Sequence, residues 1–396
     1  MHIHTRKDGE SIARIAERYG VWEEDVRQIN DIGSGEAAVG EELLILIPTR
    51  SYTACHGDTL ERIALRFGVP KRELISQNPR LHNRQPRPGE RIALKYGERQ
   101  YGTAVANGYF YKGCTRGALE FSLPYLTYVT FCSAVADRRN IRRTNDDRVE
   151  VTIANREGKI PLLRVYDRHP ERFSSGENPE RFAEEMITIA RNGDYKGIVL
   201  DTCRLGDSAK DFCAFLMVLR KMMIGCDLIL ITEINGESPI EYSEYADGSV
   251  MYYPKYALQN PPDKVMGERR ILSDFACRGE SAKTFIDLPS VTRYRDGFIT
   301  YGQAMRMARR EGLEIVKNES TLLSHLTDRK QGECVFSPLS GVRYLLDLAR
   351  EFDYMGICFD IMRSPLSHLM MYNTMFKTHY YNSVRTREGC SHGGEE

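Results

Sequence analysis

Residues 195–204 read YKGIVLDTCR, a short apolar run that ends in an aspartate and a cysteine. The apolar residues follow one another instead of alternating with polar ones, which is typical of a strand buried on both faces. Such strands occur in parallel sheets that are covered by helices. This stretch therefore predicts a core strand of an α/β fold.

Eight runs of this kind, including this one, follow residue 101, and segments with a helical spacing of apolar residues separate them. The eight runs lie at 102–111, 126–135, 159–167, 195–203, 226–234, 248–256, 283–291 and 354–362. Within 339–352, for example, Val342, Leu345 and Ala349 fall on one helical face. Eight strands alternating with helices predict a closed (β/α)₈ TIM barrel.

Chemistry in a barrel of this type is found at the carboxyl ends of the strands. The side chains at or near the predicted ends are Asp167, Asp201, Cys203, Glu233, Tyr253, Asp287 and Asp360. These residues are the candidates for a site in the barrel mouth.

Composition excludes several classes of partner. The 396 residues include 55 basic and 55 acidic ones, so no net charge attracts nucleic acid or an anionic membrane. No apolar run approaches the roughly 20 residues that span a bilayer. The start, MHIHTRKDGES, has charges where a signal peptide has its apolar segment. We expect a protein made in the cytoplasm, without a membrane span or a nucleic-acid partner.

The ten cysteines include no C-x-x-C pair, which argues against a zinc site and against a secreted disulfide scaffold. We therefore expect no metal and no cofactor. Cys390 lies in a polar, glycine-rich tail, residues 381–396, that we predict to be disordered. Whether Cys390 or the 22 tyrosines form cross-links stays open, as does the oligomeric state.

The first hundred residues contain a repeat. DGESIARIAERYGVWEEDVRQIN (8–30) and HGDTLERIALRFGVPKRELISQN (56–78) align without a gap, and each is followed by a Gly-Glu turn and a short apolar strand. Ser11 and Thr59 stand at helix N-cap positions, and Gly20 and Gly68 at C-cap positions. Each copy therefore predicts a strand, two helices and a second strand.

This repeat resembles the LysM module, which binds N-acetylglucosamine glycans such as peptidoglycan and chitin. The resemblance places a sugar groove between the loop after the first strand and the loop before the second. It carries glycan binding onto Gly9, Glu10, Ser11, Ile12, Asn30, Asp31 and Ile32 in the first copy, and onto Gly57, Asp58, Thr59, Leu60, Asn78, Pro79 and Leu81 in the second. Glu10 departs from the aspartate that is usual there. Two linked modules would raise avidity for a repeating polymer.

Two LysM-like modules before a barrel resemble the spore-germination N-acetylglucosaminidases of glycoside hydrolase family 18. The resemblance divides the chain into modules at 1–50 and 51–97, a barrel at 101–380 and the tail. PYLTYVTFCSAV resembles the family's second strand, YKGIVLDTC its catalytic fourth strand, and ITYGQAMRMARREGLEIV a helix after a seventh-strand insertion.

The catalytic strand lacks the family's acid. In these enzymes a glutamate protonates the glycosidic oxygen, and an aspartate two residues earlier orients the substrate's own N-acetyl group. The pattern places Asp201 at the aspartate and Cys203 at the glutamate. A thiol with an ordinary pKa near 8.5 is a poor proton donor at neutral pH, and losing a general acid costs roughly 10²- to 10⁴-fold in rate. Tyr253 keeps the family's sixth-strand tyrosine, whereas Asp360 stands where a tryptophan is usual.

Two sharper interpretations of these residues stay open. Cys203 could be a nucleophile, but that chemistry needs a base and no barrel strand end offers a histidine. Alternatively, Glu233 and Asp360 could flank Asp201 across the barrel mouth, with Glu233 as a relocated acid.

The sequence thus predicts a peptidoglycan-binding protein of the spore envelope, deposited in the coat or cortex, with an inactive family-18-like barrel. One alternative is an active peptidoglycan N-acetylglucosaminidase that uses a relocated acid. Another is a scaffold whose barrel mouth binds spore coat proteins. Nothing in the sequence separates cortex, vegetative wall and chitin as the glycan, because LysM modules bind the N-acetyl groups common to all three.

Overall fold

The computed structural model describes residues 1–97, 102–137, 140–167, 178–201, 209–234, 244–252, 264–294, 297–319, 321–328 and 332–378. Cys203, Tyr253, Cys390 and the predicted tail lie outside these residues. Among the described helices, none is both long enough and apolar enough to cross a bilayer.

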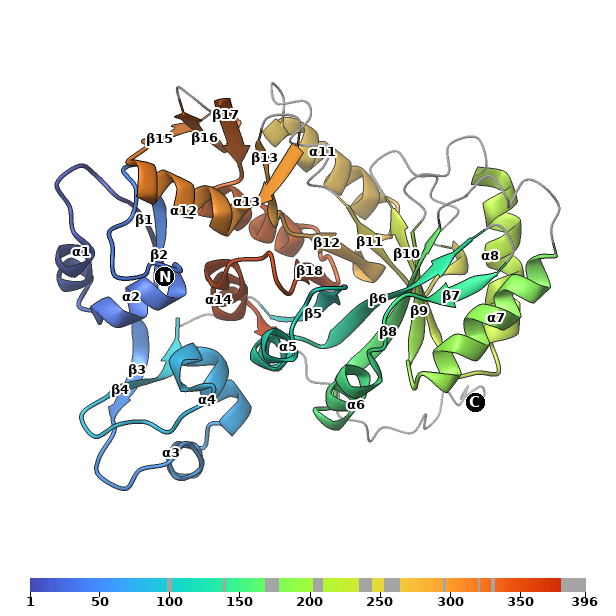
Figure 1. Ribbon diagram of the computed structural model, residues 1–396, viewed down its shortest axis with the longest axis horizontal. Helices are drawn as coiled ribbons and strands as arrows, with labels where there is room; N and C mark the ends of the chain where they lie inside the picture. Colours follow the sequence, from blue (N-terminus) through green and yellow to red (C-terminus); the bar gives the residue numbers. More distant parts are fainter. Residues whose placement is uncertain are drawn as a thin grey trace, which may run out of the picture.

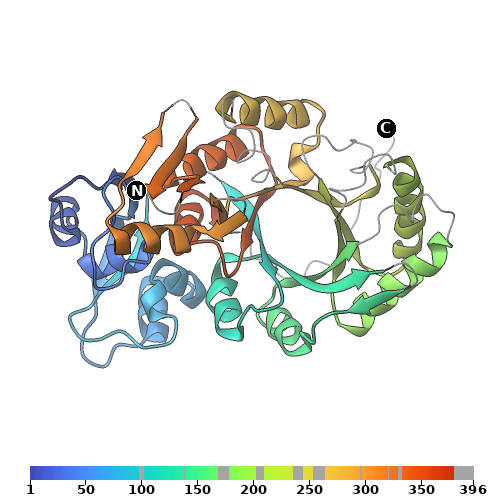
Figure 2. The same ribbon diagram turned by 45° about the horizontal axis from the view of Figure 1, so that its top comes forward.

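The predicted barrel is confirmed. Eight parallel strands pair in the order β5-β6-β8-β9-β10-β11-β12-β18, and β18 pairs with β5 to close the ring (Figure 2). The strands are β5 (Thr103–Phe110), β6 (Tyr128–Ala136), β8 (Ile160–Asp167), β9 (Gly197–Asp201), β10 (Ile229–Ile234), β11 (Gly248–Met251), β12 (Thr284–Asp287) and β18 (Gly356–Asp360). They correspond to the eight apolar runs of the sequence.

Helices cover the outside of the ring, as the alternating pattern predicted (Figure 1). They are α5 (Arg116–Ser122), α6 (Arg148–Arg156), α7 (Pro179–Asn192), α8 (Ala209–Met223), α11 (Lys264–Cys277), α13 (Leu339–Glu351) and α14 (Leu366–Met375), with 3₁₀ turns η2 (Leu123–Tyr125) and η6 (Ser281–Lys283). Two short strands extend the sheet: β7 (Ile141–Arg143) pairs with β6, and β19 (Lys377–Thr378) pairs with β5.

An antiparallel sheet is inserted between β12 and α13. Its strand order is β14-β13-β17-β16-β15. The strands are β13 (Val291–Tyr294), β14 (Gly297–Thr300), β15 (Ile315–Asn318), β16 (Leu323–Asp328) and β17 (Gly332–Phe336). Helix α12 (Tyr301–Glu311) lies between β14 and β15, so it is part of the insertion and does not follow it. Thr300 and Gln303 form a capping box at its start.

The two repeats fold as the sequence predicted. Module 1, residues 2–45, contains β1 (His2–Thr5), α1 (Ile12–Tyr19), α2 (Glu23–Ile29) and β2 (Glu42–Ile45). Module 2, residues 48–96, contains β3 (Pro48–Thr53), α3 (Leu60–Phe67), α4 (Lys71–Gln77), the 3₁₀ turn η1 (Pro79–Leu81) and β4 (Arg91–Tyr96). The side chains of Ser11 and Thr59 cap α1 and α3, and Gly20 and Gly68 end these helices with φ of 64° in both. Strand β3 runs from Pro48 to Thr53, so the expected boundary between the modules, after residue 50, falls inside this strand.

Both modules are packed onto the barrel. Ile29 and Leu44 of module 1 and Ala93 and Tyr96 of module 2 belong to the same hydrophobic core as the barrel helices. Tyr125 of η2 is buried, and its hydroxyl donates a hydrogen bond to the Ser76 carbonyl of module 2 at 3.0 Å. The modules and the barrel therefore share one continuous interior.

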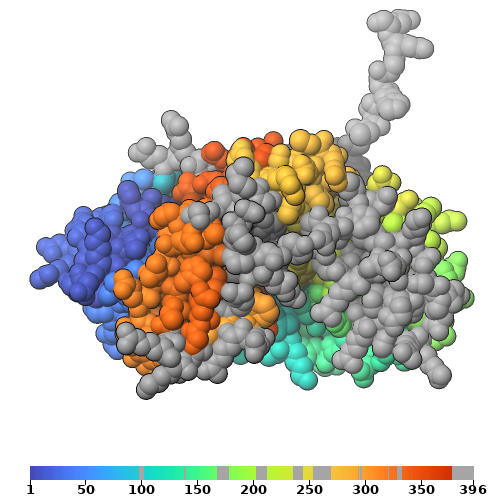
Figure 3. Space-filling view, turned by 90° about the horizontal axis from the view of Figure 1, so that it is seen from above, coloured from blue at the N-terminus to red at the C-terminus, as the bar shows by residue number. Residues whose placement is uncertain are grey.

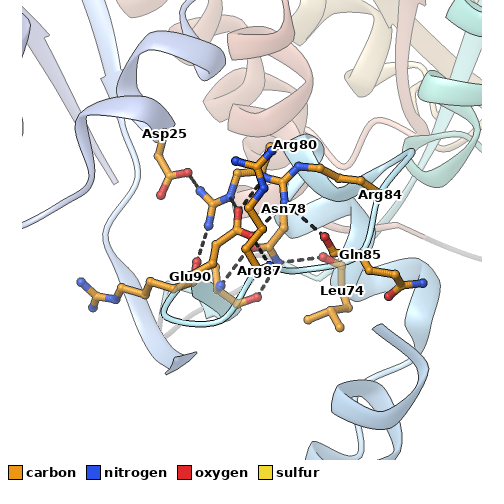
Figure 4. A network of polar contacts seen from close by, with 10 residues as sticks. Asp25, Leu74, Asn78, Arg80, Arg84, Gln85, Arg87 and Glu90 are labelled. Atoms are coloured by element: carbon orange, nitrogen blue, oxygen red, sulfur yellow. Dashed lines mark hydrogen bonds and ion pairs between the residues drawn. The ribbon is translucent and has the colours of Figure 1, made fainter. Parts of the chain in front are cut away.

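An arginine holds the two modules together (Figure 4). Arg80 pairs with Asp25 of module 1 and, through Nε at 2.8 Å, with Glu90 of module 2. Arg84 also pairs with Glu90, at 2.7 Å. Burial alone would raise the pKa of Glu90, but the Arg84 and Arg87 hydrogen bonds and the charge of Arg80 lower it to about 2. Glu90 is therefore ionised wherever the protein is folded near neutral pH.

A second arginine fastens module 1 to the insertion, against which it lies in Figure 3. Arg309 of α12 pairs with the buried Glu41, with Nε and Oε2 3.1 Å apart, and donates to the Asn30 carbonyl at 3.0 Å. Ile315 donates its backbone N–H to the Val39 carbonyl at 2.8 Å. This interface joins residues almost 280 positions apart in the chain.

Replacing Arg309 with alanine should destabilise the protein by about 3–5 kcal/mol, because it leaves the Glu41 carboxylate buried without its cation. The free energy of unfolding in denaturant measures this loss. Arg310→Ala is the matched control: Arg310 is exposed on the same helix, and its loss should change the free energy by less than about 0.5 kcal/mol. Equal effects of the two substitutions would contradict the docking role.

Lys159, which directly precedes β8, gives a pH-dependent test. Its buried ammonium donates to the Leu126 carbonyl at 2.7 Å, and burial lowers its pKa from 10.5 to about 7. Between these values the unfolded chain binds the proton and the folded chain does not. The free energy of unfolding should therefore rise with pH from about 7 to 10.5, relative to a Lys159→Met variant. If the free energy of unfolding depends on pH in the same way in both proteins, the lowered pKa of Lys159 is contradicted.

Candidate functional site

The inside of the barrel changes from apolar to polar along the strands. Side chains of a strand alternate between its two faces, so every second residue points inward. Leu162, Val199 and Ile231 pack together inside the ring. Two residues further along the same strands stand Arg164, Asp201 and Glu233. Asp201 and Glu233 lie at or next to the carboxyl ends of their strands, where barrel chemistry is found.

Arg164 connects the two predicted carboxylates. Its Nε and Nη2 each lie 2.6 Å from an oxygen of Glu233, which is a bidentate pair, and Nη2 lies 3.0 Å from Oδ2 of Asp201. Glu233 and Asp201 are register partners on β10 and β9. The structure thus brings Asp201 and Glu233 together, with a guanidinium between them.

Two tyrosine hydroxyls complete the surroundings of Glu233. Tyr109 and Tyr252 donate to its Oε1 at 3.0 and 3.3 Å. Glu233 is 0% exposed. Burial raises the pKa of both tyrosines well above the usual 10, so both stay protonated as donors. Burial alone would lower the pKa of Arg164, but the Glu233 charge outweighs it and the net shift is upward.

Asp360 belongs to a separate cluster at the end of β18. Its Oδ1 accepts the backbone N–H groups of Met362 and Arg363 at 3.1 and 3.0 Å, and Oδ2 lies 3.4 Å from the Arg363 guanidinium. Arg363 also lies over the ring of Tyr111, 4.5 Å from its centroid. Burial raises the pKa of Asp360. This carboxyl group is held by the turn that follows its strand.

The sequence reasoning missed Tyr109, Tyr252 and, above all, Arg164. The signal was an arginine in the otherwise apolar run PLLRVYD, at an inward position by the alternation of the strand. An arginine inside a barrel needs a buried anion as its partner. Of the remaining predicted site residues, Asp167 ends β8 and Asp287 ends β12, whereas Cys203 and Tyr253 are not among the described residues.

Arg164→Met should lower the free energy of unfolding by about 3–5 kcal/mol, because Glu233 would lose this bidentate cation while staying buried. The double variant Arg164→Met/Glu233→Gln removes the uncompensated charge, so its loss should be smaller than the sum of the two single losses. Denaturant unfolding of the four proteins gives this coupling energy, and additive losses would contradict it.

The predicted grooves of the two modules are bridged by side chains. In module 1 the Ile12 N–H donates to Glu36 Oε2 at 2.7 Å, and in module 2 the Leu60 N–H donates to Gln85 Oε1 at 2.7 Å. Each bond joins the start of the first helix to the loop before the last strand. Both loops of the predicted groove therefore lie side by side in each module.

Several predicted groove residues serve the fold of the module itself. The Asn30 side chain bonds Val26 and both backbone groups of Leu44, and Asn78 does the same with Leu74 and Ala93. Glu10 accepts from Lys7 N at 2.9 Å, much as Asp58 accepts from Cys55 N at 2.7 Å. The longer glutamate thus makes the same turn contact as the aspartate.

The groove residues are divided between surface and core. Ile12, Ile32, Leu60, Pro79 and Leu81 are buried, and Gly9, Asp31 and Gly57 are exposed. Asp31 lies 3.2 Å from Arg306 of α12, so this edge of the first groove adjoins the insertion.

Module 2 has an open pocket of about 410 Å³ at its groove. Leu60, Leu81 and Gln85 line it, together with Ile75, His82 and Asn83 and the long side chains of Lys71 and Arg84. Its apolar floor and polar rim are typical of sites that bind small ligands.

The repeats match the family model described as LysM domain over residues 4–45 and 52–95. The two repeats are LysM domains. The resemblance seen in the sequence is thereby confirmed for this part of the chain.

One curated relative shares sequence with part of this chain. It is the Bacillus subtilis (strain 168) protein named "Putative sporulation-specific glycosylase YdhD", 32% identical over 94 residues. The match covers 24% of this chain and only 22% of the relative.

Solved structures share the fold of all or part of this chain. The spore cortex-lytic enzyme SleL of Bacillus cereus superposes with a TM-score of 0.73 over 96% of this chain and 99% of its own, at 16% identity. A GH18 chitinase of Cycas revoluta superposes with a TM-score of 0.59 over 68% of this chain and 99% of its own, at 13% identity. At these identities the likeness concerns the fold alone, which is that of SleL with a GH18-like barrel.

Proposed function

We propose that this protein binds peptidoglycan, or another N-acetylglucosamine polymer, in the spore envelope, and that its barrel does not hydrolyse the glycan. The two LysM domains and the open groove of module 2 support the binding. The likeness to a spore cortex-lytic enzyme and to a protein named for sporulation supports a location in the spore envelope.

The burial of Glu233 and its pairing with Arg164 are the main support for an inactive barrel. A general acid must reach the glycosidic oxygen and release a proton to it. Glu233 is fully buried, and Arg164 occupies both of its oxygens. Glu233 and Asp201 both contact Arg164. Glu233, the candidate for a relocated acid, is therefore held in an ion pair.

A second candidate is an active N-acetylglucosaminidase that uses Asp360. Burial raises the pKa of this carboxyl group, which favours its protonated form, and it ends a barrel strand. The two turn N–H groups that bind Oδ1 favour the ionised form, however, and they fix the carboxyl group toward its own turn. We therefore prefer the binding function.

Incubation of the full chain with spore-cortex peptidoglycan separates these functions. We expect the protein to sediment with the polymer and mass spectrometry to find no newly released fragments. Fragments ending in N-acetylglucosamine would show hydrolysis, and their loss in Asp360→Asn would assign the acid.

Groove variants test the LysM domains as the binding surface. Asn83 is exposed at the rim of the module 2 groove, so Asn83→Trp should fill the groove without disturbing the core and weaken binding on the order of tenfold, about 1.4 kcal/mol. Ser34→Trp is the corresponding change in module 1, and together the two should weaken binding further. Unchanged sedimentation of the double variant would refute a LysM groove as the site.

A further inference from the structure

A crevice of about 470 Å³ lies between module 2 and the barrel. Helix α4 and His82 of module 2 form one wall, and η2 and α6 of the barrel form the other. Its apolar surface comes from Ile75, Leu123, Pro124 and Ile153. The volume falls within the roughly 300–1,000 Å³ of sites that enclose small ligands.

This crevice adjoins the LysM groove of module 2. Lys71, Ile75 and His82 line both hollows. A chain molecule that lies in the groove can therefore extend past these three residues and meet the barrel. The His82 ring packs edge-on against Phe121, 5.4 Å between centroids, which fixes this wall to the barrel.

The crevice is rich in cations. Among the described residues that line it, Lys71, Arg72 and Arg156 are cationic, Lys159 is a buried base whose pKa is lowered to about 7, and Glu120 and Glu157 are acidic. Lys71 pairs with Glu61 at 2.5 Å and Arg156 with Glu157 at 3.7 Å. These are surface pairs, each worth little in water, so an incoming anion can compete for the cations.

The repeat shows that this charge is a property of module 2. In the gap-free alignment Lys71 and Arg72 correspond to Glu23 and Glu24 of module 1. Glu23 pairs with Arg27 at 2.7 Å within its own helix. The same two positions thus carry opposite charges in the two LysM domains, and the positive pair stands where the chain borders the barrel.

We propose that this crevice binds the carboxylate groups of a glycan whose neutral N-acetyl sugars lie in the module 2 groove. The ligand is then an N-acetyl glycan that carries carboxylates, such as peptidoglycan with free lactyl groups or with the carboxylates of the peptides attached to them, and not neutral chitin. The inference rests on the proposed function, because it assumes that the module 2 groove holds the sugars.

Two soluble tetrasaccharides provide the test with the full chain. One is the neutral tetramer of N-acetylglucosamine, and the other alternates N-acetylglucosamine with N-acetylmuramic acid and has free lactyl carboxylates. We expect the acidic tetramer to bind about tenfold more tightly at low salt, and the preference to shrink as salt screens the charges. Isothermal titration calorimetry gives both affinities.

Charge reversals then locate the preference. Arg72→Glu and Arg156→Glu alter exposed side chains on the two walls of the crevice, and each should reduce the ratio of the two affinities by about tenfold. Arg148→Glu is the control, since Arg148 is exposed on the same helix as Arg156 but does not line the crevice. It should leave the ratio unchanged.

The outcomes are distinct. If both tetramers bind equally well, or if all three variants keep the preference, the crevice is not the carboxylate site. Binding of sugars by the LysM domain would still stand. Failure of both tetramers to bind would overturn the proposed function and the crevice together. A preference lost in Arg72→Glu and Arg156→Glu but kept in Arg148→Glu would support it.

Discussion

The pairing of Arg164 with Glu233 is the contact on which the interior of the barrel depends. Glu233 and Asp201 stand side by side on neighbouring strands, so two carboxylates would otherwise repel each other in an apolar enclosure. One guanidinium reaches both. Arg164 therefore allows a charged layer to rest on the hydrophobic layers below it.

The two LysM domains show how one repeat position can serve different interfaces. Glu41 and Glu90 occupy the same place in the Gly-Glu turn of each copy. Glu41 pairs with Arg309 of the insertion, whereas Glu90 pairs with Arg80 and Arg84 of its own module. A buried carboxylate in this turn needs a cation in either case, and the surroundings decide which part of the chain supplies it.

The sequence predicted the strands of this fold well because each barrel strand is a continuous apolar run and each repeat carries its own caps. It placed Asp201 and Glu233 near each other because strand ends meet at one rim of a barrel. The pairing of Arg164 with Glu233 could not be foreseen from spacing alone, because Arg164 is on β8 and Glu233 is on β10, with β9 between them. The docking arginines were hidden for a similar reason: on α12, Arg306 and Arg309 fit the polar face of any amphipathic helix. Cys203 and Tyr253 lie outside the described residues, so their place in the site stays a prediction.

The shared core of modules and barrel has a mechanical consequence. Tyr125 and Ser76, Arg309 and Glu41, and Arg80 and Asp25 join the three parts at separate points. Tension on a polymer held by module 2 would thus pass into the barrel through packed side chains, and not along a flexible tether. The molecule would resist such a pull as a single stiff body, in which the direction of the bound strand is set by the fold.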